Sequence, residues 1–403
     1  MNVNRITSRL IVSLSLGASA LIVVPSHATA TISSVPTNPF ALSLPQPKAA
    51  WVLDRIPCGA KICVRLLTSN NQGSTWATQH LPSALSSWLS NEATTVGSTG
   101  DVHMHFSSAQ DGWMYGAQRS TSSSASELWV TTTGGVRWSQ IASTVRGLRT
   151  AILAVGSQGG NVYVVAWRDG QHLGLWRSPL KSNRWQLVAT PTLPVAAGGS
   201  AMVGSLTFVG STGWLIIGND RGVTGAARLA SSGDWVAMNA PCATVGNSFA
   251  VPVPLFGSTA VALCTIGGFG SNVDAGTPPS LALGTNWLFS STDGGGSFHP
   301  LRVFGRSQQN QVVGASAAYG PYAASLFSTR SVNHATGVIL QRSTSLGARW
   351  LTVASASSTA LTPQFTSLRL AQNFGGVIVQ TSPTHTTLWL THDTGQHWSS
   401  TLR

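Results

Sequence analysis

Apolar and polar residues follow a short pattern that recurs along this chain. In residues 128–138, 175–185 and 388–398, a Leu-Trp pair is followed by a polar stretch, and a second Trp stands nine residues after the first. The polar stretch contains Gly, Ser, Thr and Asn, which are residues that favour tight turns. Each segment therefore predicts a β-strand, a turn and the start of a further strand.

Weaker copies extend this pattern over most of the chain. Residues 289–298 keep the register with Phe in place of Trp, and residues 231–235 are shortened. The aromatic residues that end the seven copies are Trp76, Trp138, Trp185, Trp235, Phe298, Trp350 and Trp398. They lie 47 to 63 residues apart, which is near the roughly 40–50 residues of a propeller blade, with insertions in two repeats.

A second pattern precedes the first one. Residues 106–116 and 208–218 run from Phe through turn residues to Gly-Trp and end in Gly, and residues 40–51 are a looser copy. We interpret this pattern as strands A and B of a repeat, with strand C in the Leu-Trp stretch and strand D after the final aromatic residue. The sequence thus predicts an all-β fold, a seven-bladed β-propeller of four-stranded antiparallel blades over residues 31–403.

The turns between strands C and D resemble the Asp-box (BNR) repeat, Ser/Thr-x-Asp-x-Gly-x-Thr-Trp. The Asp, Gly and aromatic residues that match it are Asp293, Gly295, Phe298, Asp393, Gly395 and Trp398. In the other copies the Asp is lost, as at Asn71, Thr133, Leu180 and Ser345. The hydroxyl and the carboxylate of such a box bind backbone N–H groups, so we expect Asp293 and Asp393 to shape turns rather than to catalyse a reaction.

The two patterns together resemble the repeats of photosystem II stability/assembly factor-like propellers, which are exported proteins. The N-terminus also indicates export. Arg5 and Arg9 precede an apolar stretch from Leu10 to Val24, and Ala28 to Ala30 offer a small-residue cleavage site. This is the order of a secretory signal peptide, and the stretch is shorter than the roughly 20 residues of a spanning helix. We expect cleavage after residues 1–30 and a secreted, extracytoplasmic monomer without a transmembrane segment.

The composition agrees with a globular, exported chain. Hydrophobic residues make up 42% and charged residues only 8%, so a sizeable core can be buried. The net charge of +12 reflects a shortage of acids, with 23 Lys and Arg against 11 Asp and Glu. The basic residues are dispersed, which gives no support for nucleic-acid binding.

The four cysteines predict two disulfides in an oxidising compartment. Cys58 and Cys63 are five residues apart and Cys242 and Cys264 are 22 apart, and we expect these two pairs, although three pairings are formally possible. Neither spacing is that of a zinc knuckle. Asp101, His103 and His105 alternate along strand A of the second repeat, but a fourth metal ligand is not visible. We therefore expect neither a metal nor another cofactor.

The candidate binding face follows from the strand order. If strand A is parallel to strand C, the B–C hairpins and the D–A connections lie on the same face of the propeller. Both Cys pairs and the two longest insertions fall in these connections. Leu81 to Gly100 contains Trp88 and Glu92, and Gly267 to Thr285 contains Asp274. Long loops on a rigid scaffold commonly bind ligands, although a merely tolerated insertion is an equal alternative. We expect a protein or glycan partner here.

A sialidase-like glycoside hydrolase is the alternative function, because sialidases also carry Asp boxes. Arg55-Ile56-Pro57 matches their Arg-Ile-Pro motif but lies too close to the first turn segment at Ser69 to leave room for the expected acid/base Asp. Glycoside hydrolysis needs two positioned carboxyl groups, and most acids of this chain lie in expected turns. We therefore favour the interpretation that the chain is a non-catalytic propeller.

Overall fold

The computed structural model describes residues 32–33, 35–94, 102–116, 127–141, 152–169, 172–182, 184–191, 203–209, 211–219, 222–242, 248–256, 259–266, 286–304, 310–317, 324–332, 337–345, 348–358, 364–382 and 384–401. All of them belong to the compact unit Thr31–Arg403. The expected signal peptide and the insertion that contains Asp274 lie outside the described residues.

The described strands form seven antiparallel sheets, which we number 1 to 7 along the chain. Sheet 1 has the spatial order β1-β5-β4-β3-β2 and comprises β1 (Ile32–Ser33), β2 (Pro39–Gln46), β3 (Ala49–Cys58), β4 (Lys61–Ser69) and β5 (Trp76–Gln79). Sheets 2, 3 and 4 comprise β6 (Val102–Phe106), β7 (Gly112–Gly116), β8 (Leu128–Thr131), β9 (Ser139–Gln140); β10 (Ile152–Gln158), β11 (Asn161–Asp169), β12 (His172–Pro179), β13 (Gln186–Val188); and β14 (Val203–Val209), β15 (Thr212–Asn219), β16 (Gly222–Leu229), β17 (Trp235–Ala237). Sheets 5, 6 and 7 comprise β18 (Ser248–Phe256), β19 (Thr259–Ile266), β20 (Asn286–Ser291), β21 (His299–Phe304); β22 (Asn310–Ala317), β23 (Ala324–Val332), β24 (Gly337–Ser343), β25 (Leu351–Ser357); and β26 (Gln364–Ala371), β27 (Phe374–Ser382), β28 (His385–Thr391), β29 (Ser399–Ser400).

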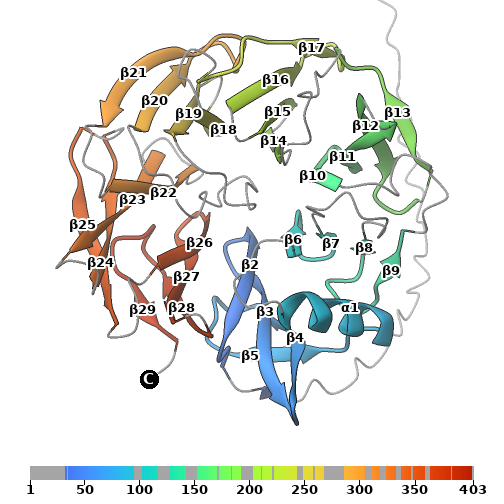
Figure 1. Ribbon diagram of the computed structural model, residues 1–403, viewed down its shortest axis with the longest axis vertical. Coiled ribbons are helices and arrows are strands. Elements are labelled where there is room, and N and C mark those ends of the chain that lie inside the picture. The colour runs from blue at the N-terminus through green and yellow to red at the C-terminus, as the bar shows by residue number, and fades with distance from the viewer. Residues whose placement is uncertain are drawn as a thin grey trace, which may run out of the picture. The chain divides into compact units, whose positions relative to one another are not determined.

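Within sheets 2 to 7 the strands follow one another in chain order, as the A–D assignment predicts. At most junctions the first strands of neighbouring sheets, with β2 taken as the first for sheet 1, contact each other, for example β2 with both β6 and β26. Figure 1 shows these first strands at the inner ends of the sheets and the last strands at the outer ends. Because the strands alternate in direction, the B–C hairpins lie at one end of the strands of each sheet and the A–B turns lie at the other end.

Apolar side chains pack between neighbouring sheets rather than within a single sheet. Leu42 and Val52 of sheet 1 belong to one buried cluster with Phe374 and Ile378 of sheet 7. Similar clusters join sheets 1 and 2, 2 and 3, 3 and 4, 4 and 5, and 6 and 7. A sheet that is buried on both faces needs apolar residues at consecutive positions, which explains the unbroken apolar runs in the middle strands.

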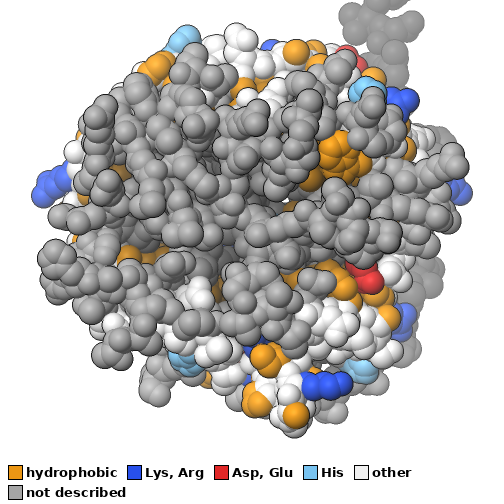
Figure 2. All heavy atoms as spheres, in the orientation of Figure 1, with side chains coloured by type: hydrophobic (Ala, Val, Ile, Leu, Met, Phe, Trp, Pro, Cys, Tyr) orange, Lys and Arg blue, Asp and Glu red, His pale blue; other side chains and the backbone are white. Residues whose placement is uncertain are grey.

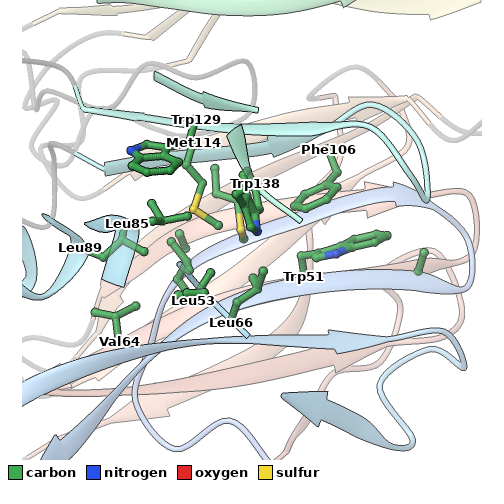
Figure 3. Packing of buried hydrophobic residues seen from close by; sticks show 14 residues of the cluster. Trp51, Leu53, Val64, Leu66, Leu85, Leu89, Phe106, Met114, Trp129 and Trp138 are labelled. Carbon is green, nitrogen blue, oxygen red and sulfur yellow. The ribbon is translucent and has the colours of Figure 1, made fainter. Parts of the chain in front are cut away.

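The insertion between sheets 1 and 2, expected to be a loop, contains a helix instead. Helix α1 spans Ser83–Thr94. Leu85 and Leu89 are spaced four residues apart and are both buried, which places them on one face of the helix. Leu81, which precedes the helix, is also buried. Figure 3 shows Leu85 and Leu89 directed toward Val64 and the other apolar side chains between the two sheets.

Two further features concern the strand before β2 and the helices. Strand β1 adds a fifth, outermost strand to sheet 1 by pairing Ile32 with Ala77 and Ser33 with Trp76. No helix within the described ranges is long and apolar enough to cross a membrane.

Candidate binding surface on sheet 1

The turn between β20 and β21 binds its own backbone through Asp293. The hydroxyl of Ser291 accepts a hydrogen bond from the N–H of Gly295 at 2.8 Å and donates one to Asp293 at 2.7 Å. The Asp293 carboxylate accepts the N–H of Ser297 at 3.0 Å and the Ser297 hydroxyl at 2.8 Å. The N–H of Ser297 and then the hydroxyl of Ser291 hold the pKa of Asp293 well below its usual range.

Asp393 has the corresponding place in the turn between β28 and β29. Its partial burial alone would raise its pKa, but bonds from His397, Thr391 and Gln396 outweigh burial and lower the pKa to about 2. The backbone N–H groups of His397 and Gln396 donate at 3.0 and 2.9 Å, and the Thr391 hydroxyl donates at 2.8 Å. All these bonds are local to the turn.

Uncharged residues make the same bonds in other turns. Asn71 accepts the N–H of Thr75 at 2.9 Å, and Thr133 accepts the N–H of Arg137 at 2.9 Å. The geometry therefore needs an oxygen acceptor at this position and not a negative charge.

The aromatic residues that end the two best-matched turns pack inward. Trp398 meets Phe327 of sheet 6 edge-on, with 6.2 Å between ring centroids, and donates to the carbonyl of Gly395 at 3.2 Å. Phe298 packs against the buried cluster between sheets 4 and 5. These residues thus join neighbouring sheets.

Asp54, one of the acids without an expected turn, is fully buried in β3. Its carboxylate forms an ion pair with the guanidinium of Arg65 on β4 at 2.7 Å, where the Arg65 side chain is 15% exposed. It also accepts the backbone N–H groups of Thr37 and Asn38 at 3.0 and 2.6 Å. These three partners make Asp54 an anchor for the segment that precedes β2.

The histidines of β6 stack on aromatic rings of the adjacent strand. His103 lies 4.7 Å from the ring of Tyr115, and His105 lies 4.8 Å from the ring of Trp113. Asp101, the third member of the alternating set, lies outside the described residues. No group of three or more His, Cys, Asp or Glu side chains suited to a metal occurs in the described part of the chain.

Strands β3 and β4 extend beyond both strands that flank them. The pairing of β2 with β3 stops at Pro39 and Asp54, and the pairing of β5 with β4 stops at Gln79 and Leu66. Residues 55–64 therefore form a two-stranded ribbon, the name used for them below. The ribbon ends in a two-residue turn, with Cys58 paired to Lys61.

A disulfide between Cys58 and Cys63 ties the two strands of the ribbon, with 5.8 Å between their Cα atoms. The second disulfide, Cys242–Cys264, joins the connection after sheet 4 to β19. Cys242 and Cys264 are both buried. The ribbon disulfide is thus the surface member of the two, since Cys58 is exposed.

Helix α1 lies beside the ribbon and contacts β4 (Figure 1). Trp88 is half-buried and packs against the apolar cluster under the helix, so the helix holds part of its side chain inward. Glu92 lies in the last turn of the helix. The structure therefore brings together the first insertion and the first Cys pair, which the sequence placed on one face.

The Arg-Ile-Pro motif lies in this ribbon. The Arg55 guanidinium stands 4.4 Å from the centroid of the Phe40 ring. Burial lowers the pKa of Arg55, while the nearby Asp54 charge raises it. The motif thus forms part of a hairpin and contacts an aromatic ring.

Sequence reasoning did not single out Ala60, Lys61 or Ile62 in the ribbon, and it named Ile56 and Pro57 only as part of the Arg-Ile-Pro motif. Pro57, Ala60 and Lys61 are exposed, and Ile56 and Ile62 are half-exposed. Figure 2 shows hydrophobic side chains gathered beside a basic one at the edge where Figure 1 places β3 and β4. Counting outward from the turn would have identified the register of this hairpin, including the facing of Asp54 and Arg65.

Comparisons with known proteins identify the architecture. No family model matches the chain, and no curated protein matches its sequence. YCF48 bound to D1 peptide is similar in structure, with a TM-score of 0.53, 13% identity, and coverage of 91% of this chain and 94% of that one. The chain is a β-propeller.

Two other propellers have quite different activities. The propeller domain of the Trilobed protease from Pyrococcus furiosus gives a TM-score of 0.51 at 9% identity, covering 90% of this chain and 97% of that one. A polysaccharide lyase, an ulvan lyase bound to a sugar ligand, gives 0.55 at 11% identity, covering 93% and 97%. At such identities the likeness shows the fold alone, because propellers support many functions.

Proposed function

We propose that this chain is an exported, non-catalytic propeller of seven degenerate Asp-box blades that binds a protein or glycan partner. The partner binds on the face formed by the B–C hairpins and D–A connections. The observation that carries the proposal is the ribbon beside α1: a hairpin that extends past its sheet, is tied by a disulfide and exposes apolar and basic side chains. Of the ribbon residues, Val64 alone belongs to the buried cluster between sheets 1 and 2.

The contacts between sheets support the seven-bladed arrangement. Sheets 1 and 7 share a buried cluster, and β2 contacts β26. The similarity to YCF48, a propeller bound to a peptide, supports a binding role. The two disulfides support an extracytoplasmic location.

The roles of four described acids favour binding over hydrolysis. Asp54 is buried and paired, and Glu127 accepts a hydrogen bond from the indole of Trp129 at 2.7 Å. Asp293 and Asp393 bind their own turns. A sialidase-like hydrolase, the alternative, would need two of the acids to meet at a substrate.

A cross-linking experiment tests the binding face. A photoreactive residue is placed at Ala60, in the ribbon turn, or at Ser74, in the turn between β4 and β5 at the opposite edge of the same sheet. Both positions are exposed. In cells that export the protein, we expect covalent adducts from position 60 and not from position 74. Adducts from position 74 alone would contradict the proposed face.

An activity assay tests the alternative. We expect the purified chain not to release sialic acid and not to cleave aryl glycosides. Turnover that disappears in Arg55→Ala would instead support the hydrolase.

A further inference from the structure

We propose that the ribbon is the contact site for a protein segment that carries carboxylates beside apolar side chains. This inference rests on the proposed function, because the ribbon lies on the proposed binding face. It adds the place on that face and the chemical class of the partner.

The ribbon is a preorganised element. Its base is held on one face by α1, whose Leu85 and Leu89 pack in one buried cluster with Val64. Its tip is closed by the Cys58–Cys63 disulfide. A rigid surface loses little conformational entropy on binding, which is the condition for a small contact area to contribute usefully to affinity.

The face that remains open carries the disulfide. Successive residues of a strand point to opposite faces, so Ile56 and Lys61 lie on the face of the two cysteines, opposite Val64 and the helix. Ile56 is half-exposed and Lys61 is exposed. The open face thus presents an apolar side chain and a positive charge on the two sides of the disulfide.

At the β3 edge of the ribbon, recognition through side chains is favoured over addition of a backbone strand. The N–H of Arg55 faces the β2 side, where it donates to the carbonyl of Asn38 at 3.0 Å. The next residue on that edge of β3 is Pro57, which has no N–H to offer. Proline at such a position is a common protection against strand addition.

The charges of the ribbon favour a carboxylate partner. Lys61 is exposed on the open face, and the ribbon contains no acid. Arg55 lies on the opposite face with Val64, over the ring of Phe40. The adjacent Asp54 is fully buried and neutralised by Arg65. A partner carboxylate therefore meets attraction without a competing negative charge. The ribbon also contains no aromatic ring on which a sugar could pack, so a protein segment fits better than a glycan.

A displayed library of random dodecapeptides, selected on the whole mature chain, tests this inference. The selected peptides are then measured by fluorescence anisotropy against Lys61→Glu and Ile56→Ser. Lys48→Glu is the matched control, because Lys48 is an exposed lysine in the β2–β3 turn at the other edge of the same sheet. Thermal melts verify that all variants fold.

We expect the selected peptides to combine Asp or Glu with apolar residues. Binding should weaken about tenfold or more in Lys61→Glu, fall also in Ile56→Ser, and stay unchanged in Lys48→Glu. Higher salt should weaken binding to the wild type. Equal binding to Lys61→Glu and the wild type, or a library that yields no peptide dependent on the ribbon, overturns the inference.

Two results separate this inference from the proposed function. His385 lies in the B–C hairpin of sheet 7. Peptides that bind Lys61→Glu as well as the wild type, but bind His385→Ala more weakly, would support the proposed face and refute the ribbon as the contact site. Peptides that depend on Lys48 would refute both. Binding to vesicles of phosphatidylglycerol and phosphatidylcholine is measured separately. If the chain binds these vesicles through Lys61 and the library yields no peptide that depends on the ribbon, the partner is a membrane surface and not a protein segment.

Discussion

The side chain of Asn38 is hydrogen-bonded to Thr386, which lies 348 positions later in the chain. Its amide oxygen accepts the backbone N–H of Thr386 at 3.0 Å and the Thr386 hydroxyl at 2.8 Å. Its amide nitrogen donates to the carbonyl of Thr384 at 2.9 Å. These bonds join the segment between β1 and β2 of sheet 1 to sheet 7.

Replacing Asn38 should weaken this junction. We expect Asn38→Ala to lower the free energy of unfolding by about 1–3 kcal/mol, because partly buried groups of sheet 7 lose their partners. Denaturant unfolding measures the change. Asn161→Ala is the control, since among the described residues the Asn161 amide donates to the carbonyl of Gly159, two positions away. Equal effects of the two substitutions would mean that the junction adds no special stability.

Asp54 holds the same segment from the other side. In Asp54→Ala, the Arg65 guanidinium and the N–H groups of Thr37 and Asn38 lose their acceptor. We expect a loss of about 3–5 kcal/mol in the free energy of unfolding, the range for breaking one side of a buried ion pair. The double variant Asp54→Ala/Arg65→Met should recover part of it. A single variant as stable as the wild type would show that the pair is dispensable.

Gly295 meets the indole of Trp214 in the neighbouring sheet. A Cβ at Gly295 would lie 1.8 Å from the indole nitrogen, whereas a Cβ at Gly294 would meet nothing within 4 Å. Both glycines have positive φ, 80° and 72°. Their Ala variants share the backbone penalty, so the difference in melting should isolate the clash. We expect Gly295→Ala to be less stable than Gly294→Ala by about 1–3 kcal/mol.

The turns that contain Asp293 and Asp393 should make the stability of the protein mildly sensitive to acid, and only at low pH. The folded pKa of Asp393 is lowered from 3.8 to about 2, and that of Asp293 is also lowered. A carboxylate whose pKa is lower in the folded state than in the unfolded state stabilises the fold at pH values above its unfolded pKa. This stabilisation is lost as the pH falls through the folded pKa. Melting temperature should therefore stay nearly flat from neutral pH to about pH 4 and decline between about pH 4 and 2.

The double variant Asp293→Asn/Asp393→Asn should flatten that decline. Asn71 shows that an amide can make the turn bond, so stability at neutral pH should change little. Thermal melts across the range decide the matter. A steep fall above pH 5 in the wild type would point to other titrating groups.

The disulfides should contribute unequally to stability. By the loop-entropy relation, the longer Cys242–Cys264 bridge contributes about 3 kcal/mol. The short ribbon bridge should contribute less, and its removal in Cys58→Ser/Cys63→Ser should affect binding more than folding. Peptide mapping checks both pairs, and a Cys58–Cys242 link would contradict the strand order around them.

The sequence predicts the parts of this protein that depend on neighbours within a few positions. Strands A to D follow in order because each turn is made by residues a few positions apart, such as Ser291, Asp293 and Gly295. The helix in the first insertion was missed, although Leu85 and Leu89 have helical spacing, because a short apolar stripe in a polar insertion resembles a loop.

Contacts between distant segments were decided only by the tertiary structure. Asn38 meets Thr386, Trp214 covers Gly295 and α1 lies against β4 because particular sheets become neighbours. Local patterns are set by backbone geometry and turn chemistry, which act over a few residues. The position of the ribbon beside the helix depends on buried apolar surface shared by sheets 1 and 2, and that burial exists only once both sheets have formed and packed together.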